Sequence, residues 1–182
     1  MTPIPNPDTT AMLIPAWVDD TLMPVDKLEV HRRGLRHMAV SVFILCGDDV
    51  LIQRRALGKY HTPGLWANTC CTHPHWDEPP KVCAVRRLRQ ELGLVAPDLV
   101  HRGQVEYRAD VGSGLTEHEL VDVFVGRVAA RPELALNPDE VMQADWVSLT
   151  GLAERVTQSP DQFTPWLRIY LAQHAARIFG AA

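Results

Sequence analysis

The 182-residue sequence predicts an α+β fold, in which a mixed β-sheet is packed between helices as an α/β/α arrangement. Segments with strand and helix character are interleaved, but without the regular alternation of a parallel α/β protein. The length suits one domain with a hydrophobic core. A hydrophobic share of 46% and a charged share of 22% exclude fibrous, disordered and membrane classes. We expect a flexible tail over residues 1–10 and a single domain over residues 11–182.

The first expected elements are two strands followed by an irregular loop. Residues 39–46 form an apolar run typical of a strand buried on both faces, and the turn at 47–49 leads into a returning strand over 50–53. Residues 60–75 are rich in Pro, Gly, Trp, Cys and His without periodicity. We therefore expect an irregular loop there, which is a common location for chemistry.

A helix is predicted to begin at Pro79 and Pro80 and to end at Leu92, with Gly93 as its C-terminal stop. We expect one apolar face of this helix to pack against the sheet, through Val82, Val85, Leu88 and Leu92. The opposite side carries Cys83, Arg87 and Glu91. Further elements are expected as strands over 104–109, 117–128 and 146–147 and as helices over 152–156 and 165–179.

Charge and cysteine content bound the partners and the compartment. With 18 Lys plus Arg against 22 Asp plus Glu, the net charge of −4 argues against nucleic acid as a partner. The longest apolar run, residues 38–46, is far below the roughly 18 residues that a membrane span needs. The four cysteines do not resemble a disulfide framework, so we expect a cytoplasmic protein.

Two short motifs are candidate sites. Glu117 and Glu119 are two apart on a strand and share one face, where two carboxylates repel unless a metal ion or a proton lies between them. Cys71 and His73 are also two apart, which suggests a metal pair or an activated thiol. Considered singly, the Glu-His-Glu pattern more often marks an exposed strand face, and the alternative for Cys71 and His73 is a small buried cysteine near a solvent-exposed ring.

The remaining candidates are histidines and basic residues. With His73 and the two glutamates, His31 and His37 would complete a set of nitrogen and oxygen donors suited to Mn, Mg or Zn. Each of the two is otherwise a surface histidine. A diphosphate needs several cations, often with Mg²⁺ bridged to a carboxylate such as Glu91. The nearest basic residues in sequence are Lys27, Arg55, Lys59 and Arg87.

Longer segments resemble one family. They are Arg54-Arg55-Ala56-Leu57, Pro63-Gly64-Leu65-Trp66-Ala67-Asn68-Thr69, Cys71-Thr72-His73-Pro74, Tyr107-Arg108-Ala109, Glu117-His118-Glu119, Asp139-Glu140-Val141-Met142 and Thr164-Pro165-Trp166. In this order the sequence resembles the type I isopentenyl-diphosphate isomerases over nearly its whole length. The resemblance implies the Nudix fold, with the helix ending at Gly93 as the Nudix helix.

The resemblance also implies roles for the candidate residues. A divalent metal ion would be held by His31, His37, His73, Glu117 and Glu119. Cys71 and Glu119 would be the base and the acid, with Tyr107 beside Glu119, and Trp166 would cover the hydrocarbon. The diphosphate would be bound by Lys27, Arg55, Lys59 and Arg87. Its Mg²⁺ would be held by Glu91 and the backbone carbonyl of Cys71.

The implied reaction is the isomerisation of isopentenyl diphosphate to dimethylallyl diphosphate by a monomer or weak homodimer. The alternative is a Nudix pyrophosphohydrolase, but Arg87 and Gln90 replace two of the three glutamates that its helix requires. A third possibility is a metal- or diphosphate-binding domain without catalysis. The other histidines are expected at the surface or around the site, and Cys46 and Cys83 as buried apolar groups; these histidines are His61, His75, His101, His118 and His174.

Overall fold

The structure, a computed structural model, describes residues 12–180. These residues form a nine-stranded mixed sheet with helices packed against it. The strand order is β2-β1-β3-β4-β5, and β6 and β8 also pair with β3, β7 with β8 and β9 with β4. Strands β3 and β8 run parallel over ten residue pairs from Arg36↔His118 to Leu45↔Arg127, and the other strand pairs are antiparallel. The mixed sheet with flanking helices confirms the predicted fold class. The tail predicted at 1–10 lies outside the described residues.

The elements have the following bounds. The strands are β1 Leu13–Val18, β2 Thr21–Asp26, β3 Arg36–Cys46, β4 Asp49–Arg55, β5 Trp66–Ala67, β6 Cys70–Thr72, β7 Leu99–Gly112, β8 Leu115–Arg127 and β9 Val141–Ser148. The helical segments are α1 Lys27–Arg33, α2 Pro80–Leu92, α3 Leu149–Gln158, η2 Pro160–Gln162, α4 Pro165–Ile169, η3 Tyr170–His174 and α5 Ala175–Phe179. No helix among them is long and apolar enough to cross a membrane.

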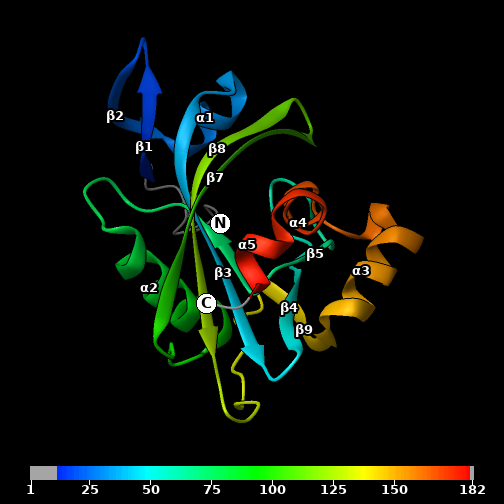
Figure 1. Cartoon of the computed structure of the whole chain (residues 1–182). Coiled ribbons are helices and arrows are strands. Elements are labelled where there is room, and N and C mark those ends of the chain that lie inside the picture. The colour runs from blue at the N-terminus through cyan, green and yellow to red at the C-terminus, as the bar shows by residue number, and fades with distance from the viewer. Residues whose placement is uncertain (1–11, 181–182) are drawn as a thin grey trace, which may run out of the picture.

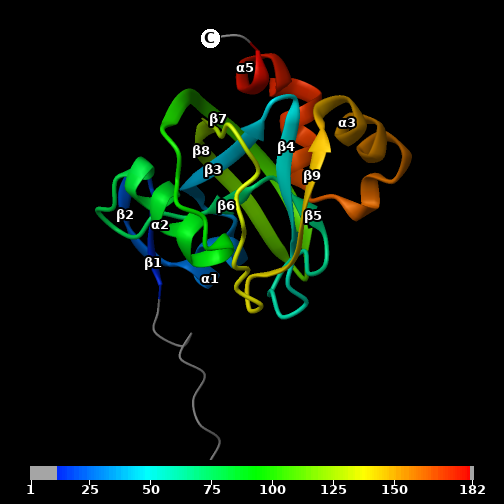
Figure 2. The same ribbon diagram turned by 90° about the horizontal axis from the view of Figure 1, so that it is seen from below.

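Strand β3 divides the hydrophobic core into two layers, because successive side chains of a strand point to opposite faces. Phe43 and Leu45 pack in the cluster that includes α3, α4 and α5, whereas Val42 and Ile44 pack in the cluster that includes α2. Figures 1 and 2 show α2 on one side of the sheet and α3, α4 and α5 on the other. The strand predicted at 39–46 is therefore confirmed as one buried on both faces.

Helix α2 begins and ends as predicted, but only half of the predicted packing face is buried. Pro80 is its first residue, and Gly93 ends it with a left-handed φ of 63°. Val82 and Val85 are 54% and 43% exposed. Leu88 and Leu92 are buried as predicted, together with Cys83, Ala84 and Glu91. The apolar pattern was misleading because the sheet side of α2 contains a polar network, in which Gln53 and Arg87 satisfy the buried carboxylate of Glu91.

Other differences from the expected elements are local. The loop predicted over 60–75 contains two short strands, β5 and β6, which are too short to have a detectable period and pair with β4 and β3. The helix predicted over 165–179 is interrupted by the π-turn η3. The hairpin β1–β2 and helix α1 were not predicted. The hairpin turns at Asp19 and Asp20, which both have positive φ, a known hairpin signal.

Candidate active site

One cavity contains most of the chemically active side chains that the sequence indicates. Its walls come from α1, β4, β6, α2, β8 and α4 and from the segments that precede β5 and β9. The lining residues are Lys27, Gln53, Arg55, Lys59, Tyr60, His61, Cys71, Thr72, His73, Arg87, Glu91, Glu117, Glu119, Glu140 and Trp166. Of the residues predicted for the site, His31 and His37 lie behind this lining, and Tyr107 contacts it through Glu119.

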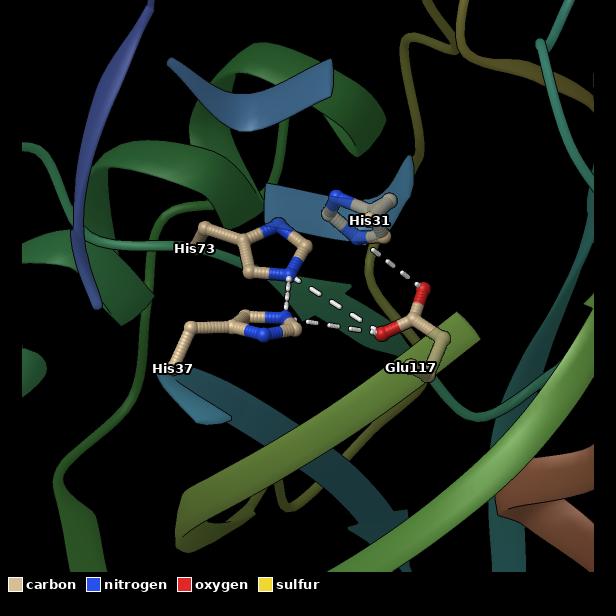
Figure 3. A group of neighbouring side chains, drawn as sticks. All are labelled: His31, His37, His73 and Glu117. Carbon is tan, nitrogen blue, oxygen red and sulfur yellow. Dashed lines mark hydrogen bonds and ion pairs between the residues drawn. The ribbon is translucent and has the colours of Figure 1, made fainter. Parts of the chain in front are cut away.

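A cluster of three histidines and one glutamate lies at the cavity (Figure 3). It consists of His31 from α1, His37 from β3, His73 after β6 and Glu117 from β8. One possible ligand atom from each lies within 4.8 Å of the other three, and all four residues are buried. The Nε2 atoms of His37 and His73 are 3.2 Å apart, and Nε2 of His31 is 3.5 Å from Oε1 of Glu117.

The orientation of the rings fits a bound cation. Nδ1 of His31 lies 2.6 Å from the carbonyl oxygen of Lys27, and Nδ1 of His37 lies 2.8 Å from that of Leu35. Since a carbonyl oxygen only accepts, both Nδ1 atoms carry the proton and both Nε2 lone pairs face the cluster. Within residues 12–180, Nε2 of His31 and Oε2 of Glu117 are buried without a hydrogen-bond partner. The residues present therefore fit a divalent metal ion.

Helix α1 links this cluster to the basic residues. Asp26 caps the helix by accepting a hydrogen bond from the backbone N–H of Glu29, and Gly34 ends it in a left-handed conformation. Lys27 and His31 are four residues apart, so both side chains lie on the same face of the helix. A single turn of α1 therefore presents a cation to the cavity and an imidazole to the cluster.

Glu119 lies beside Glu117 on the same face of β8. Its Oε1 is 2.9 Å from Nε2 of His73, and its Oε2 accepts a 2.6 Å hydrogen bond from the hydroxyl of Tyr107 on β7. Both carboxylates are buried, whereas the intervening His118 points to the other face and lies 3.4 Å from Glu106. The alternation that the sequence predicts for this strand is thus present, and Glu119 joins the cluster from the side of Tyr107.

The two carboxylates differ in protonation. Burial, followed by the charge of Glu117, raises the pKa of Glu119. Burial also acts on Glu117, but the neighbouring side chains of Glu119, His31 and His61 outweigh it and hold the pKa of Glu117 well below its usual range. The pair therefore contains one ionised carboxylate and one carboxyl that keeps its proton, which is the state a proton donor needs.

The adjacent cysteines point in opposite directions. Cys71 lines the cavity and accepts a 3.3 Å hydrogen bond from the hydroxyl of Ser41, whereas Cys70 packs in the core layer that contains α2. Burial, followed by the charge of Glu119, raises the pKa of the Cys71 thiol well above its usual value. Of these two thiols, only that of Cys71 lies in the cavity with Glu119.

Four basic side chains converge at the cavity, namely Lys27, Arg55, Lys59 and Arg87. Burial, together with the charges of Lys59 and Arg87, lowers the pKa of Lys27 to about 8. Two carboxylates hold Lys59 and Arg87 in place: Lys59 is 2.5 Å from Glu140, and Arg87 is 3.2 Å from Glu140 and 2.6 Å from Glu91. Cations crowded in this way favour a multiply charged anion.

Trp166 and Arg55 close one side of the cavity. The indole is 1% exposed, and the Arg55 guanidinium lies 5.4 Å from the ring centroid, within the range of a cation–π contact. The ring therefore already interacts with a positive charge on the cavity side.

Sequence reasoning did not single out His61 as a site residue. The structure buries it in the cavity wall, with Nε2 3.0 Å from Oε1 of Glu117. One signal in the sequence could have indicated His61 as a site residue. It lies two residues after Lys59, inside the loop that was expected to carry chemistry. The other four histidines left aside lie outside the cavity lining, and Cys83 is buried as expected. Cys46, expected to be buried, is only half-buried because it ends β3 next to the β3–β4 turn.

Comparison with known proteins identifies the family at the level of sequence. Residues 35–167 match the family model described as NUDIX domain. The chain is 64% identical over 170 residues to the isopentenyl-diphosphate Delta-isomerase of Cereibacter sphaeroides, which covers 92% of this chain and 95% of that protein. It is 61% identical over 168 residues to the protein of the same name from Dinoroseobacter shibae, covering 92% and 96%.

Solved structures with low identity share the fold. The MutT NUDIX hydrolase from Burkholderia pseudomallei matches with a TM-score of 0.60 and 21% identity, over 76% of this chain and 98% of that chain. DR0079 from Deinococcus radiodurans matches with a TM-score of 0.63 and 14% identity, over 80% and 88%. The family model spans most of the chain, and relatives with 61–64% identity span nearly all of it. The chain therefore belongs to the Nudix family and, within it, to the isopentenyl-diphosphate Delta-isomerases.

Proposed function

We propose that this protein converts isopentenyl diphosphate to dimethylallyl diphosphate, by adding a proton at C4 and removing one from C2 through a tertiary cation at C3. The observation that carries the proposal is the presence of two proton-transfer groups, Glu119 and Cys71, in one buried cavity with an indole and four cations. Moving a double bond by one position requires one acid and one base, so these two groups suffice.

Glu119 is the proposed acid. Burial and the neighbouring charge keep its carboxyl protonated, and the 2.6 Å hydrogen bond from Tyr107 fixes the orientation of that carboxyl. After the proton has left for C4, Tyr107 continues to donate to the new carboxylate and stabilises its charge. The carboxyl of Glu119 therefore carries the proton to be donated and has a fixed orientation.

Cys71 is the proposed base. Its raised pKa keeps the free thiol protonated, so the thiol must first release its proton to solvent. The thiolate then takes the proton from C2, and the return of one proton to the Glu119 carboxylate restores the starting state. Ser41 donates to the sulfur and thereby favours the thiolate once it forms. Trp166 would stabilise the cation at C3 through the face of its ring, an interaction worth about 2 kcal/mol when desolvated. Burial of this region also limits the water that would trap the cation.

The four cations would bind the diphosphate, and carboxylates would hold the ions. Glu91 and the backbone carbonyl of Cys71 would hold Mg²⁺ on the diphosphate, beside Arg87. His31, His37, His73, Glu117 and Glu119 would hold Mn²⁺, Mg²⁺ or Zn²⁺, whose positive charge would make the carboxyl of Glu119 a stronger acid.

The proposal extends to location and assembly. We propose a cytoplasmic enzyme, in which residues 11–182 act as one domain on a small prenyl diphosphate, without nucleic acid or membrane as a partner. The four free thiols support a reducing compartment. We also propose a monomer or weak homodimer.

Deuterium incorporation tests the reaction. Isopentenyl diphosphate incubated in heavy water with the metal-loaded protein should give dimethylallyl diphosphate with one deuterium in a methyl group, detected by NMR or mass spectrometry. The variants Glu119→Gln and Cys71→Ala should lose this incorporation while retaining the fold. A fully loaded wild-type sample that incorporates no deuterium would contradict the proposal.

The same samples test hydrolysis. In the helix of a Nudix pyrophosphohydrolase, acidic residues hold the catalytic metal ions, but here Arg87 places a guanidinium 2.6 Å from the remaining Glu91. We therefore expect no release of phosphate from prenyl or nucleoside diphosphates. A non-catalytic binding domain would show neither deuterium incorporation nor phosphate release.

A further inference from the structure

His61 contacts the His/Glu cluster from the segment between β4 and β5. Its side chain is 5% exposed, its Nε2 is 3.0 Å from Oε1 of Glu117, and its Nδ1 is 3.1 Å from the hydroxyl oxygen of Thr62. The rings of Tyr60 and Trp166 lie edge-on to the imidazole, at centroid distances of 4.4 Å and 6.0 Å. Both ring nitrogens therefore have partners, and packing fixes the plane of the ring.

The backbone around His61 is also held in place. The carbonyl oxygen of His61 accepts a 3.2 Å hydrogen bond from the Arg55 guanidinium, and the N–H of Gly64 donates to the carbonyl of Arg55. Thr62 has a φ of 47°, in the left-handed region that a residue with a β-branched side chain rarely adopts. Such a conformation persists only where surrounding contacts enforce it, so the position of the imidazole is predetermined.

The hydrogen-bond partners define the tautomer of His61. A carboxylate only accepts, so Nε2 of His61 carries the proton that it shares with Glu117. Nδ1 is then the acceptor, and the hydroxyl of Thr62 donates to it. His31 and His37 have the opposite tautomer, because their Nδ1 atoms donate to backbone carbonyls. His61 therefore has no lone pair on the atom that faces the cluster and does not act as a ligand.

The contact with His61 also distinguishes the two oxygens of Glu117. Oε1 faces His61, whereas Oε2 lies 3.9 Å and 4.0 Å from the Nε2 atoms of His37 and His73. Among the described atoms, Oε2 has no hydrogen-bond partner. Oε1 also lies 3.5 Å from Nε2 of His31, so the oxygen that His61 leaves free is the one that faces the Nε2 atoms of both His37 and His73.

We infer that His61 is a positioning residue of the metal site, which donates a hydrogen bond to Oε1 of Glu117 and so presents Oε2 of that carboxylate to the ion. The inference rests on the metal site of the proposed function. Outer hydrogen bonds of this kind typically contribute about 10- to 100-fold to metal affinity.

Metal binding itself provides the test, independently of turnover. The metal-free protein is titrated with Co²⁺ or Zn²⁺ against a competing chelator, and the dissociation constant is measured. His61→Ala should bind the ion about 10- to 100-fold more weakly than wild type. His61→Gln retains a side-chain N–H and should recover most of this loss. Thr62→Val, which removes the hydroxyl that selects the tautomer, should show a smaller loss.

His101→Ala is the matched control. His101 forms a similar imidazole–carboxylate pair, with Nε2 2.8 Å from Asp122, but it lies outside the cavity lining. Its removal should leave metal affinity unchanged. Melting temperatures of the metal-free variants show whether each is folded, and the visible spectrum of bound Co²⁺ should keep its bands in His61→Gln because the ligands are the same.

Three results would overturn the inference. They are an unchanged affinity in folded His61→Ala, an equal loss in His61→Gln, and a Co²⁺ spectrum in His61→Gln that indicates one ligand fewer. If wild type itself binds neither ion, the metal site of the proposed function is wrong, and this inference falls with it. The deuterium assay with the wild-type protein separates that result from failure of the isomerase proposal.

Discussion

At the residue scale, the chemistry depends on which of two adjacent thiols faces the cavity. Strand β6 pairs with β3 so that Ser41 lies opposite Cys71 and Val42 opposite Cys70. Since side chains alternate along a strand, Cys71 meets the cavity and Cys70 meets Leu88 in the other core layer. A shift of one residue in this pairing would exchange the two thiols.

Replacing each cysteine in turn tests this assignment. Cys71→Ala should lower the rate of isomerisation by about 10²- to 10⁴-fold, the usual contribution of a proton-transfer group. Cys70→Ala should remain active and lose about 1 kcal/mol of stability, because it removes only a buried sulfur. Steady-state kinetics and urea unfolding measure the two effects. The opposite pattern of activities would show that Cys70 is the catalytic thiol.

Ser41 provides a second test at this scale. Its hydroxyl donates to Cys71 and lies 2.8 Å from the hydroxyl of Tyr170, and it is not among the cavity-lining residues. Ser41→Ala should therefore lower kcat about fivefold, equivalent to the roughly 1 kcal/mol of one hydrogen bond, and leave KM unchanged. Tyr170→Phe should act in the same direction and less strongly. A wild-type kcat in folded Ser41→Ala would refute the role of this hydrogen bond.

At the element scale, α2 combines structural and binding roles on one face. Leu88 and Leu92 pack in the core, while Arg87 and Glu91 on the adjoining turn reach the cavity. Gln53 on β4 donates a 2.8 Å hydrogen bond to the buried carboxylate of Glu91, which offsets the cost of its burial. The helix thus packs in the core through Leu88 and Leu92 and carries the groups proposed to bind the diphosphate.

Two substitutions on α2 test which face is buried. Leu88→Ala should destabilise the protein by about 2–5 kcal/mol, because it opens a cavity beneath the helix. Val82→Ala should change stability by no more than about 0.5 kcal/mol, because Val82 is 54% exposed. Urea unfolding at equilibrium measures both free energies. Similar losses in the two variants would contradict the observed orientation of α2.

At the scale of the whole molecule, the cluster joins segments that are far apart in the sequence. His31 precedes the first central strand, His73 follows β6, and Glu117 lies on β8. Within residues 12–180, Nε2 of His31 and Oε2 of Glu117 are buried without a hydrogen-bond partner, a cost in free energy that a bound cation would remove. A metal ion that binds only the folded chain therefore stabilises the whole fold.

Removal of the metal ion should lower the melting temperature. An ion present at 100 times its dissociation constant contributes about 2.7 kcal/mol. For a protein of this size, that corresponds to a shift of about 5–10 °C between metal-loaded and chelator-treated samples. Differential scanning calorimetry measures the shift, and His31→Ala should show little of it. An equal shift in this variant would mean that the ion binds elsewhere.

Much of the fold and site was predictable from local patterns. The apolar run at 39–46, the proline start and glycine stop of α2 and the spacing of Glu117 and Glu119 each depend on neighbours within a few residues. Leu88 and Leu92 of α2 are buried as predicted, but the exposure of Val82 and Val85 was not predictable, because the buried face includes a satisfied polar network around Glu91. The strands β5 and β6 were missed because segments of two and three residues have no period.

The sequence by itself determined the family and the residue types available for a metal ion and a diphosphate. It also determined that α2 lacks two of the three glutamates that a Nudix hydrolase requires. Those signals are local or depend on the order of motifs, so they can be read from the sequence alone. Only the tertiary structure decided that Cys71 and not Cys70 faces the cavity, that Lys27 and His31 share a helical face, and that His61 contacts Glu117. These facts arise from strand pairing and from contacts between distant segments, whose geometry no local pattern of residues specifies.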